Sequence, residues 1–149
     1  MSETKFYQNM TQLGTGIGVC FDKKLITSAL VLLYSAIDIT SWLASDKPNA
    51  TVRECFVTWV EKYLLASKPL KCTALELYSA RFGLVHTLTP DSQLVEQGKA
   101  RLIAYAWGTA KSNDLSKLID MTKLSDKAVA VQVEELWLGG LVCLRSARS

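Results

Sequence analysis

LITSALVLLYSAIDITSWL, residues 25–43, is long enough to span a bilayer as a helix. Six of its residues are Thr, Ser or Asp, and Asp38 lies toward one end of the apolar stretch, where hydrocarbon would make a carboxylate costly. The pattern therefore predicts a central helix of a globular protein, buried on most of its surface. Such a helix needs partner helices around it, and the flanking sequence indicates them.

The sequence indicates where this helix begins and ends. It begins after FDKK, where Asp22 is well placed as an N-cap, and it ends at SDKPN, where Pro48 cannot continue a helix. The next stretch, ATVRECFVTWVEKYLLAS, carries apolar residues at spacings of three and four, so it predicts a second helix over residues 50–67 that stops before Pro69.

A third helix is expected to begin near Thr73 and to reach Leu88, with apolar residues on one broad face. TPDS follows it and offers Thr89 as a cap and Pro90 as the first helical residue, which predicts a fourth helix from Pro90 to Trp107 that ends at Gly108.

The remaining segments are shorter or less regular. KAVAVQV alternates like a short strand ahead of a last helix, in which the pair Gly139–Gly140 weakens the helical pattern. Residues 1–20 are expected to be a less regular segment, with a flexible turn at the glycines 14, 16 and 18, because they do not form a G-x-G-x-x-G phosphate loop. We therefore predict a mainly all-α fold, an antiparallel bundle of about five helices, in one domain over residues 1–149.

Composition narrows the class of protein. The 149 residues are 49% hydrophobic, slightly more than a lone monomer needs, which favours an oligomer. The net charge is +3 with acids and bases interleaved, so the surface tolerates an anionic partner without specifying one. The N-terminus has no basic start followed by an apolar run, so we expect a cytoplasmic protein that does not associate with a membrane.

Cysteine spacing argues against a metal or redox centre. The chain has four cysteines far apart and a single histidine, so we expect no metal site and no cofactor, and we expect the cysteines to be small buried hydrophobes. A thiol nucleophile at Cys72 with His86 as its base is disfavoured, because the two would lie about 21 Å apart along one helix. The four tryptophans, which all fall in apolar helical patterns, are expected in the core: Trp42, Trp59, Trp107 and Trp137.

The stretch LYSARFGLVH, residues 77–86, contains the candidate chemistry. His86 is suited to accept and return a proton near neutral pH, and Arg81 is suited to hold a phosphate with paired hydrogen bonds. Together they could run phosphodiester chemistry without a metal, with Arg81 offsetting charge that develops in the transition state.

The spacing of this pair limits how it can act. Five residues on a helix are separated by about 7.5 Å along the axis and about 140° around it, so a straight helix does not aim both side chains at one atom. If two such helices met about a two-fold axis, the pairs from both subunits could converge in one cleft. A homodimer is therefore the expected functional form.

Three other polar residues belong to the predicted site. Asp38 must find a partner on its buried helix: Arg81 or His86 would suit it as a supporting group, and a neighbouring Thr, Ser or Tyr hydroxyl is the alternative. Lys99 and Arg101 are candidate substrate-binding residues on the fourth helix, or otherwise part of a solvated face.

A mostly helical domain with a long apolar helix near its start and a later R-x4-H pattern resembles the HEPN superfamily. The match is carried by RFGLVH, residues 81–86, and the helical plan covers residues 21–108. The resemblance implies a metal-independent endoribonuclease with Arg81 and His86 as catalytic residues, acting on RNA as a homodimer, as many toxins and defence proteins of this superfamily do, with an antitoxin or another protein as a possible partner.

The sequence also departs from the family pattern. In active members the residue after the arginine is commonly polar, whereas here it is Phe82, which cannot hydrogen-bond to the histidine or to a substrate. The alternative function is therefore a non-catalytic helical homodimer that serves as a protein-interaction module with a degenerate site. A pocket for a small apolar ligand among the tryptophans is a third possibility.

Overall fold

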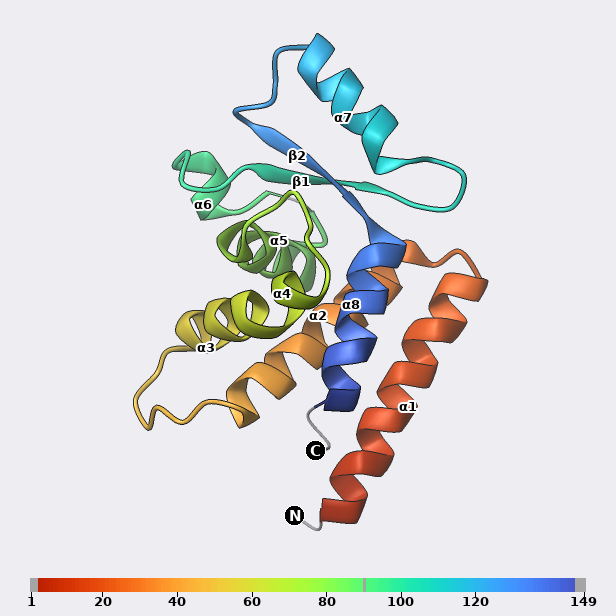
Figure 1. Cartoon of the computed structure of the whole chain (residues 1–149), viewed down its shortest axis with the longest axis vertical. Helices are drawn as coiled ribbons and strands as arrows, with labels where there is room; N and C mark the ends of the chain where they lie inside the picture. Colours follow the sequence, from red (N-terminus) through yellow and green to blue (C-terminus); the bar gives the residue numbers. More distant parts are fainter. Residues whose placement is uncertain (1–2, 90, 147–149) are drawn as a thin grey trace.

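A computed structural model describes residues 3–89 and 91–146 (Figure 1). The fold is mostly helical, as the sequence predicts, with one small two-stranded sheet in addition. Its elements follow one another in the order α1 (Glu3–Asp22), α2 (Ile26–Leu43), α3 (Val52–Trp59), the π-helical turn η1 (Val60–Leu64), α4 (Leu65–Ser67), α5 (Ala74–Thr87), α6 (Gln93–Glu96), β1 (Leu102–Ala106), α7 (Ser112–Met121), β2 (Ala128–Gln132) and α8 (Val133–Ser146).

Helix α2 is the central helix, and it packs against α1, α3, α5 and α8 (Figure 1). Among the described helices it is the one with the length and apolar composition of a membrane span, and eight of its residues are buried in this fold. The side chains of Leu33, Tyr34 and Ile37 lie fully inside the core. The hydroxyls of Ser35 and Ser41 donate to backbone carbonyl oxygens of the same helix, which is how so apolar a helix accommodates them.

The N-terminal prediction is wrong, because residues 3–22 form the continuous helix α1, and glycines 14, 16 and 18 lie inside it. This helix lies along α2 (Figure 1) and contributes Ile17 to the core. Its stability comes from that packing and not from the intrinsic preference of its sequence. Asp22 is the last residue of α1 and not the N-cap of α2, whose N-cap, Leu25, makes no side-chain capping bond.

The next two predicted helices are confirmed. Thr51 caps α3 in a capping box with Glu54, and the helix continues through η1 and α4 to residue 67. Thr73 caps α5 in the same way with Glu76, and Leu88, in the left-handed conformation, follows its last residue. Local side-chain hydrogen bonds thus place both helix starts where the sequence predicts them.

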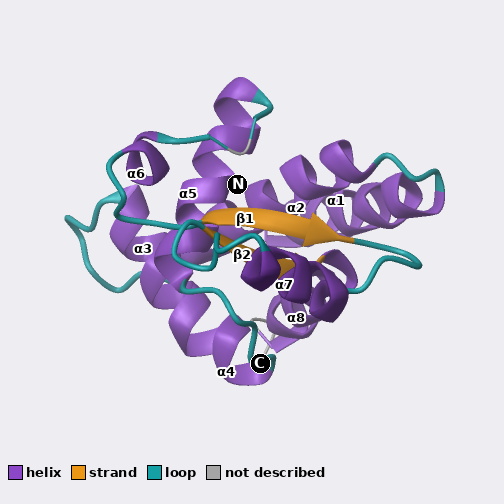
Figure 2. Ribbon diagram, turned by 90° about the horizontal axis from the view of Figure 1, so that it is seen from above, coloured by secondary structure: helices purple, strands orange, loops and turns teal. Residues whose placement is uncertain are grey.

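The predicted fourth helix from Pro90 to Trp107 is wrong. Pro90 lies outside the described residues, α6 is a single short helix capped by Ser92, and residues 102–106 form strand β1. Strand β1 pairs in parallel with β2, with Leu102 opposite Ala128, and α7 connects the two strands (Figure 2). The predicted strand and last helix at β2 and α8 are confirmed, whereas α7 is not among the predicted helices.

Two of the four tryptophans are not in the core. Trp59 is buried and Trp137 packs against the core, but Trp42 is 63% exposed and Trp107 is 48% exposed. Cys55 and Cys72 are buried free thiols, as predicted, whereas Cys20 is only half-buried. The side chain of Cys143 lies outside the described part of the chain.

The glycine pair in α8 permits a close helix contact. A Cβ atom on Gly139 would lie 3.0 Å from Leu64 Cδ1, and one on Gly140 would lie 3.1 Å from Leu33 Cδ1. Both contacts are tighter than ordinary van der Waals packing. The residues that weaken the helical pattern of the sequence therefore allow α8 to approach η1 and α2.

Replacing Gly140 by leucine is expected to lower the free energy of unfolding by about 1–3 kcal/mol, because the side chain would overpack the core at Leu33. Gly18→Leu in α1 is the matched control, since nothing lies within 4 Å of a Cβ atom built there and the change improves helix propensity. Urea unfolding of the three proteins measures both effects. Equal stability of the two variants would contradict the close contact.

Candidate functional site

Arg81 is held by Asp38 across the contact between α5 and α2. The Nε–H of Arg81 donates to Oδ2 of Asp38 at 2.6 Å, and Nη2 of the same guanidinium pairs with the same oxygen. The side chains are only 14% and 20% exposed. Of the partners that the sequence leaves open for Asp38, the structure therefore selects Arg81 and not a neighbouring hydroxyl group.

The second oxygen of Asp38 has no donor. Oδ1 is buried and has no hydrogen-bond partner among the described residues. Burial raises the pKa of Asp38, and the hydrogen bond and charge of Arg81, with a contribution from His86, act against that rise. The pKa of Asp38 stays above its ordinary value, because burial outweighs the ion pair with Arg81.

His86 lies in the last turn of α5 and is exposed to solvent. Its ring contacts that of Phe82, one turn earlier, with 4.7 Å between the ring centroids. Phe82 is itself 40% exposed, and Leu88 beyond the helix end is also exposed. His86 is therefore not sealed inside the folded chain, and the exposed ring of Phe82 lies beside it.

The structure brings Arg81 and His86 to the same helix but does not aim them at one point within a single chain. Arg81 turns toward α2 and is also near the ring of Tyr78, whereas His86 turns to solvent. Asp38 binds the guanidinium of Arg81, and a charge on His86 would act to lower the pKa of the Asp38 carboxyl. In chemical terms, the chain offers a fixed guanidinium and an accessible proton-transfer group.

A groove of about 570 Å³ opens beside the ion pair, and Arg81 and Asp38 form part of its wall. The other lining residues come from α1, α2 and α3 and are mostly apolar: Phe6, Asn9, Met10, Leu13, Ile39, Trp42, Leu43 and Val52. Sequence patterns did not indicate this groove, because they assigned Trp42 to the core. Trp42 is exposed because α1 and α3, which form the other walls of the groove, leave this side chain of α2 uncovered.

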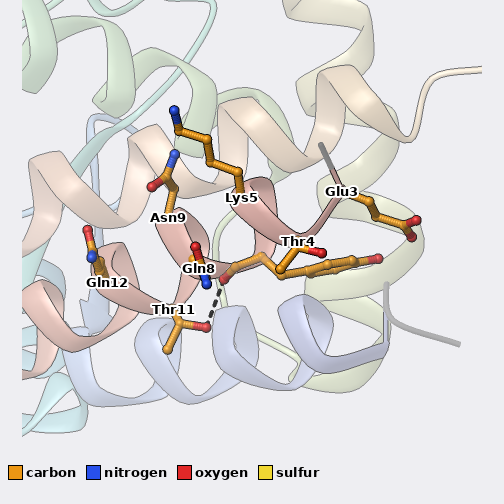
Figure 3. A pocket seen from close by; sticks show the side chains of 8 residues that line it. Glu3, Thr4, Lys5, Gln8, Asn9, Thr11 and Gln12 are labelled. Atoms are coloured by element: carbon orange, nitrogen blue, oxygen red, sulfur yellow. Dashed lines mark hydrogen bonds between the residues drawn. The ribbon is translucent and has the colours of Figure 1, made fainter. Parts of the chain in front are cut away.

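A second hollow, of about 910 Å³, lies along the first turns of α1 (Figure 3). Among the described residues its lining comes from α1 alone, and its side chains are mostly polar. The hydroxyl of Thr11 donates to the carbonyl oxygen of Tyr7 at 2.8 Å, a bond within the helix. The hollow therefore gathers no groups from different elements and offers no chemistry of its own.

Lys99 and Arg101 are not on a helix, which corrects their predicted placement. They precede β1 and line a depression of about 390 Å³ that also contains acidic side chains. Arg101 pairs with Glu76, its Nε–H donating to Oε1 at 2.6 Å. Neither Arg81 nor His86 lines this depression, and Glu76 precedes His86 by ten residues on α5, about 15 Å along the axis, so Lys99 and Arg101 belong to a different part of the surface.

A buried polar cluster lies elsewhere in the core. The hydroxyls of Tyr34 and Tyr105 share a hydrogen bond of 2.6 Å, and burial raises the pKa of both groups. Burial also raises the pKa of the Cys72 thiol to about 12, so this cysteine is protonated and inert at neutral pH. A thiol mechanism at Cys72 is therefore excluded in the folded chain.

Neither the side chains nor known proteins assign the site further. Among the side chains that the structure describes, no group of three or more His, Cys, Asp or Glu residues comes together as a metal site would require. Comparisons of the chain with protein-family models, with curated proteins and with solved structures find no match. The function must therefore be inferred from the site itself.

Proposed function

We propose that this chain is a HEPN-like helical protein that cleaves RNA without a metal ion, as a homodimer that joins Arg81 and His86 of two subunits in one cleft. The observation that carries the proposal is that Asp38 fixes the Arg81 guanidinium while His86, on the same helix, is open to solvent. Arg81 would bind the scissile phosphate through N–H groups that Asp38 does not use, and Asp38 would position it.

The proposed mechanism needs a second subunit because it requires two proton-transfer groups. Cleavage of an RNA phosphodiester by its own 2′-hydroxyl requires one group to accept a proton and another to donate one. The chain contains a single histidine, so a second copy would provide the second imidazole. The exposed side chains of Phe82 and Leu88, which are near His86 in the sequence, provide apolar surface for such a contact.

Cleavage of the phosphodiester involves two proton transfers, one by each copy of His86. One His86 takes the proton of the ribose 2′-hydroxyl, whose oxygen attacks the adjacent phosphorus and forms a 2′,3′-cyclic phosphate. The bond from phosphorus to the 5′-oxygen of the next nucleotide breaks, and the partner's His86 protonates that oxygen. Arg81 stabilises the negative charge on the phosphate oxygens during the transfer. No metal, oxidant or cofactor takes part.

Incubation of the purified chain with a pool of RNAs in the presence of EDTA tests this function. We expect products that end in a 2′,3′-cyclic phosphate and a 5′-hydroxyl, detected by end-specific labelling and mass spectrometry. Sedimentation in the same buffer should give the mass of a dimer. Absence of cleavage over a broad set of RNAs, or cleavage that EDTA abolishes, would contradict the proposal.

A second function is favoured by the surroundings of His86. Phe82 covers part of the imidazole and Arg81 is already paired, so the same surface suits a non-catalytic homodimer that binds another protein, such as an antitoxin. The two functions differ in one measurable respect. The interaction module binds its partner without consuming RNA, and replacement of His86 does not change that binding beyond the loss of local contact area.

A further inference from the structure

We infer that the groove beside the Arg81–Asp38 pair binds an unpaired guanine base. The inference rests on the proposed function for its substrate, RNA, and it assigns that substrate a base preference and a binding site. Three features of the groove lead to it: its apolar lining, the exposed indole of Trp42, and the order of hydrogen-bonding groups at its polar end.

The lining suits a flat, largely apolar group. The volume of about 570 Å³ falls in the range of small-molecule sites, most of the lining side chains are apolar, and the paired Asp38 and Arg81 form a polar part of the wall. Trp42 is 63% exposed on the groove wall, and an indole in that position provides a face on which a base can stack. Phe6 and Met10 of α1 provide apolar surface on another side of the groove.

The polar end distinguishes one base from the others. Oδ1 of Asp38 accepts no hydrogen bond, and beside it the Arg81 guanidinium has N–H donors beyond those that pair with Oδ2. A carboxylate oxygen followed by a guanidinium matches an edge on which N–H donors are followed by a carbonyl oxygen. Guanine has that edge, with N1–H and N2–H beside O6, whereas adenine and cytosine carry no carbonyl next to a ring N–H.

Because Oδ1 of Asp38 is buried, binding of a guanine base would require a movement of the groove wall. A buried carboxylate oxygen without a donor costs folding free energy, and a guanine N–H would remove that cost. Because Oδ1 is shielded in the free chain, the base must displace part of the groove wall to reach it. Trp42 and Leu43, which are both largely exposed, have the room to move aside and then to cover the base.

Calorimetric titration of the full chain with nucleoside 5′-monophosphates tests the inference. GMP is expected to bind at least about tenfold more tightly than AMP and CMP, with UMP in between because it offers one N–H beside its carbonyls. Trp42→Ala should weaken GMP binding at least about fivefold through lost stacking. Trp107→Ala is the matched control, since Trp107 is also exposed and does not line the groove, and it should leave binding unchanged.

Asp38→Asn provides a second variant, with the ratio of GMP to AMP affinity as its readout. We expect that ratio to fall toward one, an effect that a merely less stable protein would not produce. Equal binding of all four nucleotides, or no effect of Trp42→Ala, would overturn the inference. So would a monomeric Trp42→Ala chain from a dimeric parent that binds no GMP, because a second copy would then occupy the groove.

The outcomes separate this inference from the proposed function. GMP-selective binding without any RNA cleavage would contradict the nuclease and leave the guanine site in place. Cleavage with 2′,3′-cyclic ends but without selective GMP binding would contradict the guanine site and leave the nuclease in place. The two measurements use the same full-length protein and different readouts.

Discussion

His86→Ala is expected to lower the rate of RNA cleavage by a factor of about 10² to 10⁴, because in the proposed mechanism it removes the group that transfers protons in both subunits. His86 is exposed and its ring contacts that of Phe82 at the surface, so the variant should fold like the parent. Initial rates on a cleaved RNA, measured with EDTA present, give the factor. Thermal unfolding of both proteins verifies that the loss is not a loss of fold.

Two further variants sharpen the assignment. Arg53→Ala, which removes an exposed arginine from α3, should not change the cleavage rate. Asp38→Asn should lower kcat and alter the dependence of the rate on pH, since it removes the carboxylate that positions Arg81 and feels the charge of His86. A cleavage rate that survives His86→Ala would identify a contaminating nuclease or a different site, and the proposed mechanism would then be wrong.

Glu76→Ala is expected to lower the free energy of unfolding by about 3–4 kcal/mol, the largest effect on stability that we expect from one side chain. Glu76 is buried, with 5% of its surface exposed, and it accepts hydrogen bonds from the Thr73 backbone amide and from Arg101. Truncation removes the glutamate half of the capping box of α5, while the Thr73 hydroxyl still accepts from the backbone N–H of residue 76, and it leaves the Arg101 guanidinium without its carboxylate. Urea unfolding near neutral pH measures the difference.

The matched control is Glu54→Ala. Glu54 occupies the same capping-box position on α3, but it is exposed and has no arginine partner among the described side chains, so Glu54→Ala should lower the free energy of unfolding much less. Equal losses at the two positions would mean that the Glu76–Arg101 pair adds nothing to the cap. That outcome would contradict the assignment of Glu76 as the residue that ties α5 to the segment before β1.

The same residue predicts a dependence on pH. Burial works to raise the pKa of Glu76, but the hydrogen bonds and charge of Arg101 and the bond from Thr73 outweigh it and lower the pKa. A carboxyl group with a lowered pKa stabilises the fold above its unfolded pKa of about 4.3, and this stabilisation is lost as the pH falls through the folded value. The stability difference between the parent and Glu76→Gln should therefore shrink below about pH 4.

Local signals predicted the elements that local interactions form. The apolar run at residues 26–43, the Thr73 cap and the spacing of apolar residues over 52–67 are features that neighbouring residues establish, and the corresponding helices form. The helix expected over 90–107 shows the limit of such signals. Its residues 102–106 have no partner nearby in sequence, and they become a strand because residues 128–132 lie beside them.

The sequence likewise predicts some features of the candidate site and not others. The sequence indicated Arg81, His86 and Asp38 as the polar residues of an otherwise apolar region, and it left the partner of Asp38 open. It misplaced Trp42 in the core, because an apolar helical pattern does not tell which part of its stripe the neighbouring helices leave uncovered. The groove beside Asp38 was missed for that reason.

The sequence by itself thus determined a mainly helical chain with a buried central helix, and a helix that carries Arg81 and His86, because periodicity and capping act over a few residues. Only the tertiary structure decided that Arg81 faces Asp38, that His86 faces solvent, and that a parallel sheet replaces the expected fourth helix. These features depend on contacts between residues 26 to 43 positions apart, such as Asp38 with Arg81, and no local pattern encodes the direction in which one helix crosses another.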